Sequence, residues 1–207
     1  MRQEIVLLQS GRRWRFAVLR KLVQSAPAEF LLRSLFGLFY EKRYLRGYFS
    51  GEKSLGWYWT WRGLGSRLFD VNNRASWPVH SNTVVSGTNI EFDPNNMDLF
   101  WTPGCRWQCH GSKITVGSNS YVAPNVGIIT TNHGIEDPSQ HVEGKPVHIG
   151  SSCWIGMNAV ILSGTTLGDH TVAAAGAVIT KSYPDGWVVI GGCPAKEIKR
   201  INRCENE

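Results

Sequence analysis

The chain has 207 residues, of which 42% are hydrophobic and 18% charged, and its formal net charge is +6. A chain of this length can bury a substantial core, so we expect one domain with terminal elaborations. Residues 1–46 hold ten Lys and Arg against three acids, which leaves the rest nearly neutral and argues against a nucleic-acid-binding surface there.

Cysteine usage and the early sequence bear on location. The five cysteines show no disulfide-scaffold spacing, so we expect reduced thiols in the cytoplasm. Arginines interrupt the early sequence and no long apolar core follows, so no signal peptide is expected. Cys105, Cys109 and His110 resemble half of a metal clip, but no second pair of ligands lies nearby, and no metal is expected.

Residues 12–46 are predicted to form one or two basic amphipathic helices. Their second half places Phe30, Leu31, Leu35 and Leu38 on one helical face, with Arg and Lys between the apolar positions. Two interpretations stay open: the helices cap one end of the domain that follows, or they contact the anionic inner face of the cell membrane. One helix pair could do both.

Trp57, Trp59 and Trp61 occupy alternate positions in a Gly-rich stretch. Such alternation predicts a strand or an extended cover with one aromatic face. We expect that face to pack against the core, and stacking on a sugar is the alternative.

A six-residue period governs most of the remaining chain. In a helix, residues six apart are rotated by roughly 240°, which would scatter the aliphatic side chains around the axis. In a strand they share one face. The period therefore predicts an all-β solenoid, a parallel β-helix with three short strands per coil. The recurring aliphatic residues are Val116, Val122, Ile128, Ile149, Ile155, Ile161, Leu167, Ala173 and Ile179, with a less regular pair at Val79 and Val85.

The repeat is interrupted once. Ile128 and Ile149 are twenty-one residues apart, three more than one coil of eighteen. The insertion, at about 131–146, contains Asn132-His133-Gly134 and continues through His141. A loop that leaves a rigid solenoid at one place is where functional residues usually lie.

The winding ends near Gly192. Lys196, Lys199 and Arg200 then lie on a tail that we expect to form a short basic helix. The expected organisation is a basic, Trp-rich extension over 1–70, the solenoid over 71–193 and the C-terminal tail over 194–207.

Five motifs carry a family resemblance: Tyr121-Val122-Ala123-Pro124-Asn125-Val126, Thr131-Asn132-His133-Gly134, Cys153-Trp154-Ile155-Gly156, Ala175-Gly176-Ala177-Val178-Ile179-Thr180-Lys181 and Gly192-Cys193-Pro194-Ala195. Together they resemble the hexapeptide-repeat acyltransferases, over about residues 76–201. The resemblance implies a left-handed winding and a homotrimer. Within the family the chain is similar to the galactoside, maltose and Nod-factor O-acetyltransferases, and above all to capsule and exopolysaccharide O-acetyltransferases. In that branch acetyl-CoA lies between two subunits, and a sugar hydroxyl attacks its thioester.

The resemblance implies that His133 is the catalytic base. An alcohol is a poor nucleophile until a base takes its proton, and a His with a pKa near the operating pH is suited to this. Glu143 lies near the place at which the family has a carboxylate beside the His. His141 is the competing base.

The resemblance also assigns the donor and acceptor sites. Asn125 and Gln108 are expected to face the sugar, whereas Cys153, at an inward fifth position, is expected to fill the core. The coenzyme residues implied are Trp154 and Met157 at the reactive end, Ala175 and Gly176 along the pantetheine arm, Thr180 and Lys181 at the exit towards the nucleotide, and Lys196 and Lys199 at the phosphates.

The first seventy residues do not resemble the helical head of the galactoside and maltose enzymes. Their basic character favours an acceptor held at a membrane, such as a surface polysaccharide or its lipid-linked precursor. Three alternatives stay open: acetylation of an antibiotic or a nucleotide-linked amino sugar, a metal-dependent carbonic anhydrase, and a non-catalytic solenoid. The carbonic anhydrase needs three converging His ligands, and His133, His141 and His148 lack that family's spacing.

Overall fold

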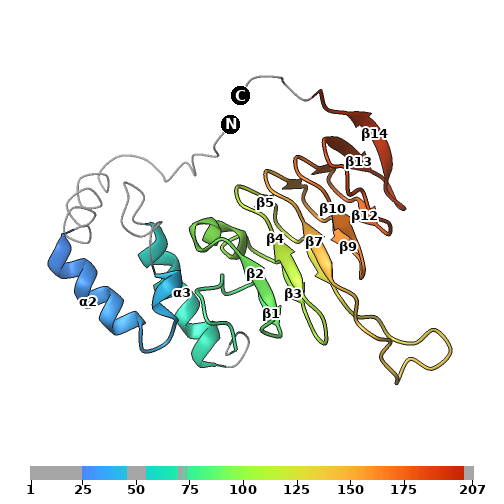
Figure 1. Cartoon of the computed structure of the whole chain (residues 1–207). Helices are drawn as coiled ribbons and strands as arrows, with labels where there is room; N and C mark the ends of the chain where they lie inside the picture. The colour runs from blue at the N-terminus through green and yellow to red at the C-terminus, as the bar shows by residue number, and fades with distance from the viewer. Residues whose placement is uncertain (1–24, 46–54, 70–71, 73, 203–207) are drawn as a thin grey trace, which may run out of the picture.

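The computed structural model describes residues 25–45, 55–69, 72 and 74–202. Of the segment 12–46 predicted as basic helices, residues 12–24 and 46 therefore lie outside the described residues. Helices lie at one end of the molecule and a solenoid of short strands extends from them (Figure 1). None of the described helices is long and apolar enough to cross a membrane.

Helix α2 packs on the rest of the molecule through one side. Pro27 lies in its first turn, where its missing N–H costs nothing, and Glu29 pairs with Arg33 one turn later at 2.8 Å. Phe36 is 3% exposed and stacks on Trp57, with ring centroids 5.8 Å apart. The helical elements before the solenoid are α2 (Ala26–Phe36), the 3-10 helix η1 (Lys42–Tyr44) and α3 (Leu55–Leu68).

The expectation of a strand or extended cover at the tryptophans was wrong, because these residues lie in helix α3. Residues two apart on a helix point in directions that differ by about 200°. Trp57, Trp59 and Trp61 therefore cannot form one aromatic face. Trp57 is 5% exposed and stacks on Phe36, whereas Trp61, one turn further along α3, is 66% exposed. A Cβ on Gly63 would lie 2.5 Å from the Val79 carbonyl oxygen, so α3 rests directly on backbone that leads into the solenoid.

The solenoid is a three-sided parallel β-helix, as the period predicted. Its walls are sheet A (β1-β3-β6-β9-β12), sheet B (β2-β4-β7-β10) and sheet C (β5-β8-β11-β13-β14), and every pairing is parallel except that of β13 with β14. The strands are β1 (Val84–Ser86), β2 (Ile90–Phe92), β3 (Arg106–Gln108), β4 (Ile114–Val116), β5 (Tyr121–Val122), β6 (Gly127–Ile129), β7 (Val147–Ile149), β8 (Trp154–Ile155), β9 (Val160–Ile161), β10 (Thr166–Leu167), β11 (Val172–Ala173), β12 (Val178–Ile179) and β13 (Val188–Gly191).

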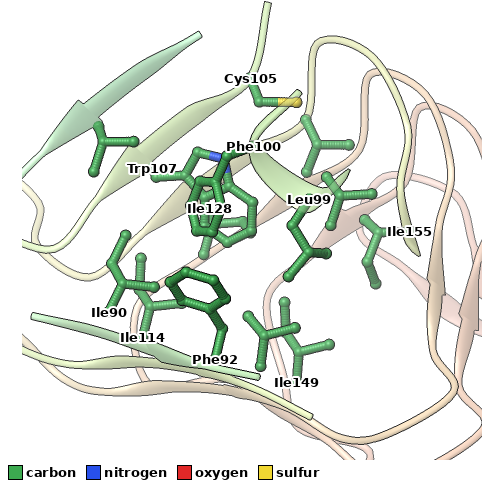
Figure 2. Close-up of a cluster of buried hydrophobic side chains, with 14 of the residues drawn as sticks. Ile90, Phe92, Leu99, Phe100, Cys105, Trp107, Ile114, Ile128, Ile149 and Ile155 are labelled. Atoms are coloured by element: carbon green, nitrogen blue, oxygen red, sulfur yellow. The ribbon is translucent and has the colours of Figure 1, made fainter. Parts of the chain in front are cut away.

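The repeating aliphatic residues fill the interior of the solenoid. Ile128 lies in register with Ile161, and Ile161 with Ile179, and all three are fully buried. Near the helical end the interior is aromatic, with the rings of Phe100 and Trp107 4.7 Å apart (Figure 2). Phe100 belongs to the 3-10 helix η2 (Pro94–Phe100), which follows β2.

The C-terminal tail is a strand, β14 (Lys196–Arg200), so the predicted short helix was wrong. The last parallel strand of sheet C, β13, would otherwise expose a row of unpaired backbone groups, and β14 covers them as an antiparallel partner. The Ile198 side chain lies over Gly191, where an added Cβ would be 2.8 Å from its Cδ1. Residues 203–207 of the predicted tail lie outside the described residues.

Candidate functional site

The inserted loop leaves the edge at which the chain passes from sheet A to sheet B, here called edge AB. It joins β6 to β7 and projects away from the solenoid (Figure 1). Its side chains are exposed almost without exception, up to 99% at Ile135. Side-chain groups on this loop are therefore open to solvent.

The root of the loop is held by hydrogen bonds to the neighbouring coils. Thr131 is 9% exposed and its Oγ1 donates to the His110 carbonyl oxygen at 2.5 Å. Ser163 Oγ donates to the Thr130 carbonyl oxygen at 2.7 Å, and Lys145 N donates to the same oxygen at 2.9 Å. These bonds fix both strands of the loop where they leave the solenoid.

Beyond its root the loop pairs with itself. His133 and His141 form an antiparallel bridge, and their ring centroids lie 4.4 Å apart. Gly134 N donates to the Gln140 carbonyl oxygen at 2.8 Å. The two imidazoles predicted as candidate bases are therefore brought together by local pairing.

A turn built on Asp137 closes the loop. Its Oδ1 accepts from Ser139 N at 2.9 Å and Ser139 Oγ at 2.7 Å, and its Oδ2 accepts from Gln140 Nε2 at 3.0 Å. The Ser139 side chain, followed by the Ser139 N–H, lowers the pKa of the Asp137 carboxyl, and Gln140 adds to this. The carboxylate thus fixes the turn that carries Pro138.

This turn determines which nitrogen of His133 is free. The Pro138 carbonyl oxygen lies 2.7 Å from His133 Nδ1. A carbonyl oxygen can only accept, so Nδ1 carries the hydrogen, and in the neutral imidazole Nε2 then has the lone pair. An imidazole held in this tautomer can accept a proton at Nε2.

The Pro138 carbonyl was not among the partners predicted for His133 from the sequence. Among the described residues no hydrogen bond or ion pair joins Glu143 to His133, and the orienting role of Glu143 stays a prediction. Asp-Pro-Ser is a sequence typical of an Asx turn, which would have predicted the turn itself. Contact of its carbonyl with His133 depends on how the loop folds.

The other predicted site residues fall in three places. Asn125, Met157, Ala175 and Gly176 line the edge at which the chain passes from sheet C to sheet A, here called edge CA; Gly176 N donates to the Met157 carbonyl oxygen at 2.8 Å. Gln108, Thr180 and Lys181 lie near edge AB, and Trp154, Lys196 and Lys199 lie on strands of sheet C.

Edges AB and CA are separated by the width of sheet A. Trp154 and Met157 are 58% and 46% exposed, so these two predicted coenzyme residues are accessible. One chain nevertheless does not bring them beside His133. A ligand that contacts both His133 and these coenzyme residues must either cross sheet A or contact the loop of a second copy.

His148, the third histidine of the carbonic anhydrase alternative, and the core cysteine Cys153 are apart from this loop. His148 lies on β7 in register with Thr115 and Thr166, on the wall of sheet B. In the described part of the chain, no group of three or more His, Cys, Asp or Glu is placed to hold a metal ion. Cys153 is 1% exposed and its burial raises the pKa of the thiol, in keeping with the expected core position.

A family model described as bacterial transferase hexapeptide (six repeats) matches residues 146–181. The solenoid contains hexapeptide repeats of the kind found in bacterial transferases. Its fold is the left-handed parallel β-helix, as the resemblance implied. The repeat family that the motifs indicated is thereby confirmed.

Curated relatives and solved structures carry related descriptions. Galactoside O-acetyltransferase of Escherichia coli K12 is 37% identical over 92 residues, 43% of this chain and 45% of that protein. The chain spans about half the length of the curated relatives it matches. A maltose O-acetyltransferase from Clostridium difficile 630 is 26% identical, with 88% of this chain and 89% of that chain covered and a TM-score of 0.46. Galactoside acetyltransferase in complex with coenzyme A is 27% identical, covering 58% and 63%, with a TM-score of 0.42.

Proposed function

We propose that this protein transfers an acetyl group from acetyl-CoA to a carbohydrate hydroxyl, with His133 as the general base. The observation that carries the proposal is the contact of His133 Nδ1 with the Pro138 carbonyl oxygen, which leaves Nε2 as the acceptor. The 37% identity to a galactoside O-acetyltransferase supports the reaction class.

The reaction is a direct transfer within a ternary complex. Nε2 of His133 takes the hydroxyl proton as the acceptor oxygen attacks the thioester carbonyl carbon. The C–S bond then breaks, and the coenzyme leaves as the thiol with the proton returned from the imidazolium. The Pro138 carbonyl stabilises that imidazolium by accepting from Nδ1–H, and a backbone N–H of the adjoining coil is proposed to stabilise the oxyanion.

Acetyl-CoA is proposed to lie along edge CA, with the arm beside Ala175 and Gly176. Nothing lies within 4 Å of a Cβ built on Gly176, so the backbone is open to a ligand there. The lysines at 181, 196 and 199 are exposed and would attract the phosphates. Because edge CA and the loop are apart in one chain, we propose a homotrimer in which the loop of one copy meets edge CA of the next.

Replacement of His133 by Ala tests the proposal. Loss of a positioned base is expected to lower kcat by about 10²- to 10⁴-fold. Since His133 is an exposed loop residue, thermal unfolding and the Kd for coenzyme A should not change. The matched control is His141→Ala on the opposing strand of the loop, which should keep most of the activity. Undiminished turnover by His133→Ala would refute the assignment of the base.

The acceptor is proposed to be a surface polysaccharide or its lipid-linked precursor. Support comes from the exposure of the loop beyond its root, which leaves room for a polymer. Assays of saccharides against antibiotics and nucleotide-linked amino sugars separate these acceptor classes. Calorimetry that shows no binding of coenzyme A would favour a non-catalytic solenoid, and stoichiometric zinc in the purified protein would favour the carbonic anhydrase alternative.

A cytoplasmic location with peripheral membrane contact through residues 12–46 also remains a proposal. It is supported by the ten basic and three acidic residues of segment 1–46. Co-sedimentation of the protein with anionic vesicles tests it.

A further inference from the structure

Helix α2 has an unusual distribution of side chains. Its charged residues, Glu29 and Arg33, are half-buried and paired with each other at 2.8 Å. Every exposed position is uncharged, the reverse of an ordinary surface helix. Here we call these positions the outer face: Ala26, Pro27, Phe30, Leu31, Ser34 and Leu35, continued by Leu38 in the turn after the helix.

The outer face is strongly apolar. Phe30 is 70%, Leu31 66% and Leu35 51% exposed, and Leu38 is 77% exposed. Leu31 and Leu35 are one turn apart and so form a continuous ridge. Isolated exposed apolar residues need no explanation, but a contiguous group of this kind marks an interaction surface.

This face is not needed to hold α2 in place. The opposite side packs through Phe36, which stacks on Trp57, and through the partly buried Leu32 and Phe39. Figure 1 shows α2 at the end of the molecule, far from β13 and β14. Among the described residues, the contacts that hold α2 in place thus leave the outer face available to a partner without rearrangement of the core.

Charge indicates what that partner is. Residues 1–74 contain fourteen Lys and Arg against five acids, whereas the rest of the chain contains eight against eleven. At the end of α2, Lys42 is exposed, and its Cε lies 3.2 Å from a Cβ built on Gly37, next to Leu38. Apolar side chains flanked by a Lys of this kind suit the boundary between lipid tails and anionic headgroups.

We propose that the outer face of α2 docks the protein on an anionic bilayer, with Leu31, Leu35 and Leu38 entering the boundary and Lys42 at headgroup level. The inference rests on the proposed peripheral contact and assigns a surface to it. It does not depend on the transfer chemistry.

The test uses the full chain and vesicles of phosphatidylcholine with or without phosphatidylglycerol. Leu31→Gln/Leu35→Gln keeps helix propensity and is expected to lower the partition coefficient onto anionic vesicles by about tenfold or more. Lys42→Gln should lower it by about fivefold on anionic vesicles and leave binding to phosphatidylcholine alone unchanged. The matched control is Ile198→Gln on β14, also exposed at 61%, which should bind as the unaltered chain does.

Three results would overturn the proposal, and they differ in meaning. If the unaltered chain binds anionic vesicles and Leu31→Gln/Leu35→Gln binds equally, the outer face is not the docking surface, although peripheral contact stands. If the unaltered chain does not bind, the peripheral contact fails as well. If the double variant changes only the oligomeric state, seen by light scattering, the outer face is a contact between copies. Circular dichroism and thermal unfolding confirm that each variant is folded.

Discussion

The chemistry of the loop depends on a few atoms around His133. Asp137 does not touch the imidazole, yet its carboxylate accepts three hydrogen bonds that hold the turn carrying the Pro138 carbonyl. Without that turn, the ring loses the acceptor that keeps the hydrogen on Nδ1. Asp137 is in this sense a positioning residue for the proposed base.

We expect Asp137→Ala to lower kcat by about tenfold, because the base spends less time in the productive tautomer and orientation. Asp137→Asn keeps an oxygen that can accept from Ser139 N and should lose less. The KM for acetyl-CoA should stay constant in both, since the coenzyme is proposed to bind at edge CA. Equal losses in kcat for Ala and Asn, or a change in KM alone, would argue against a positioning role.

The same turn has a predictable response to pH. The folded pKa of Asp137 is lowered by its hydrogen bonds, chiefly from Ser139. The ionised carboxylate therefore stabilises the turn fully above the unfolded pKa of Asp, about 3.9. This stabilisation is lost as the pH falls through the lower folded pKa. We expect the Ser139 amide, which donates to the Asp137 carboxylate, to shift in that acidic window when it is followed by NMR. A Ser139 amide without a transition in that window would contradict the assignment.

At the scale of elements, structure could be predicted from the sequence where one period repeats. It could not be predicted where the conformation depends on contacts with residues distant in the sequence. Ile149, Ile155 and Ile161 repeat a signal that only stacked strands can satisfy, so the interior could be predicted residue by residue. Trp57, Trp59 and Trp61 give only three alternating positions, and packing on the segment at Val79 selects a helix instead.

The strand at the C-terminal tail and the Pro138 contact in the loop were not predicted, for the same physical reason. Lys196 to Arg200 carry no strand signal of their own, and their conformation follows from the unpaired edge of β13. The Pro138 contact likewise depends on pairing of His133 with His141 across the loop. Local sequence patterns determine neither the strand of the tail nor the Pro138 contact, because each depends on which backbone groups the fold leaves unpaired.

Helix α3 offers a matched pair of glycines. Gly63→Ala would place a methyl group 2.5 Å from the Val79 carbonyl oxygen, so α3 must shift, and we expect a lower Tm and a loss of about 1–3 kcal/mol. Gly65→Ala meets nothing within 4 Å and should stabilise by about 0.5–1 kcal/mol through the better helix propensity of Ala. Chemical denaturation of both variants measures this difference. A similar change in both would mean that α3 does not rest on Val79.

The solenoid interior should respond strongly to truncation. Ile161 is fully buried between Ile128 and Ile179, and its removal leaves a cavity that the stacked coils cannot easily close. Ile161→Ala is expected to cost about 2–5 kcal/mol in the free energy of unfolding. Urea unfolding measures the loss. The control is Val142→Ala, which should have a small effect because Val142 is 47% exposed. A loss below that of the control would contradict the stacked register.

At the scale of the whole molecule, the question is whether one copy or two build the site. His133 leaves edge AB, whereas Ala175 lies exposed on edge CA, across sheet A. If the loop of one copy meets edge CA of the next, a variant in the loop and a variant at edge CA each disable a different half of the site. When the two variants are co-expressed, the intact half of each can then meet within one oligomer.

We therefore expect His133→Ala and Ala175→Trp each to be nearly inactive alone, because the first lacks the base and the second fills the proposed coenzyme path. Random mixed trimers would pair an intact loop with an intact edge CA at about a quarter of their sites, and activity should return to that level. Separately purified and then mixed trimers that do not exchange subunits are the control and should stay inactive. Should the co-expressed pair also stay inactive while its trimers are shown to be mixed, the base and the coenzyme must meet within one chain, across the outer surface of sheet A.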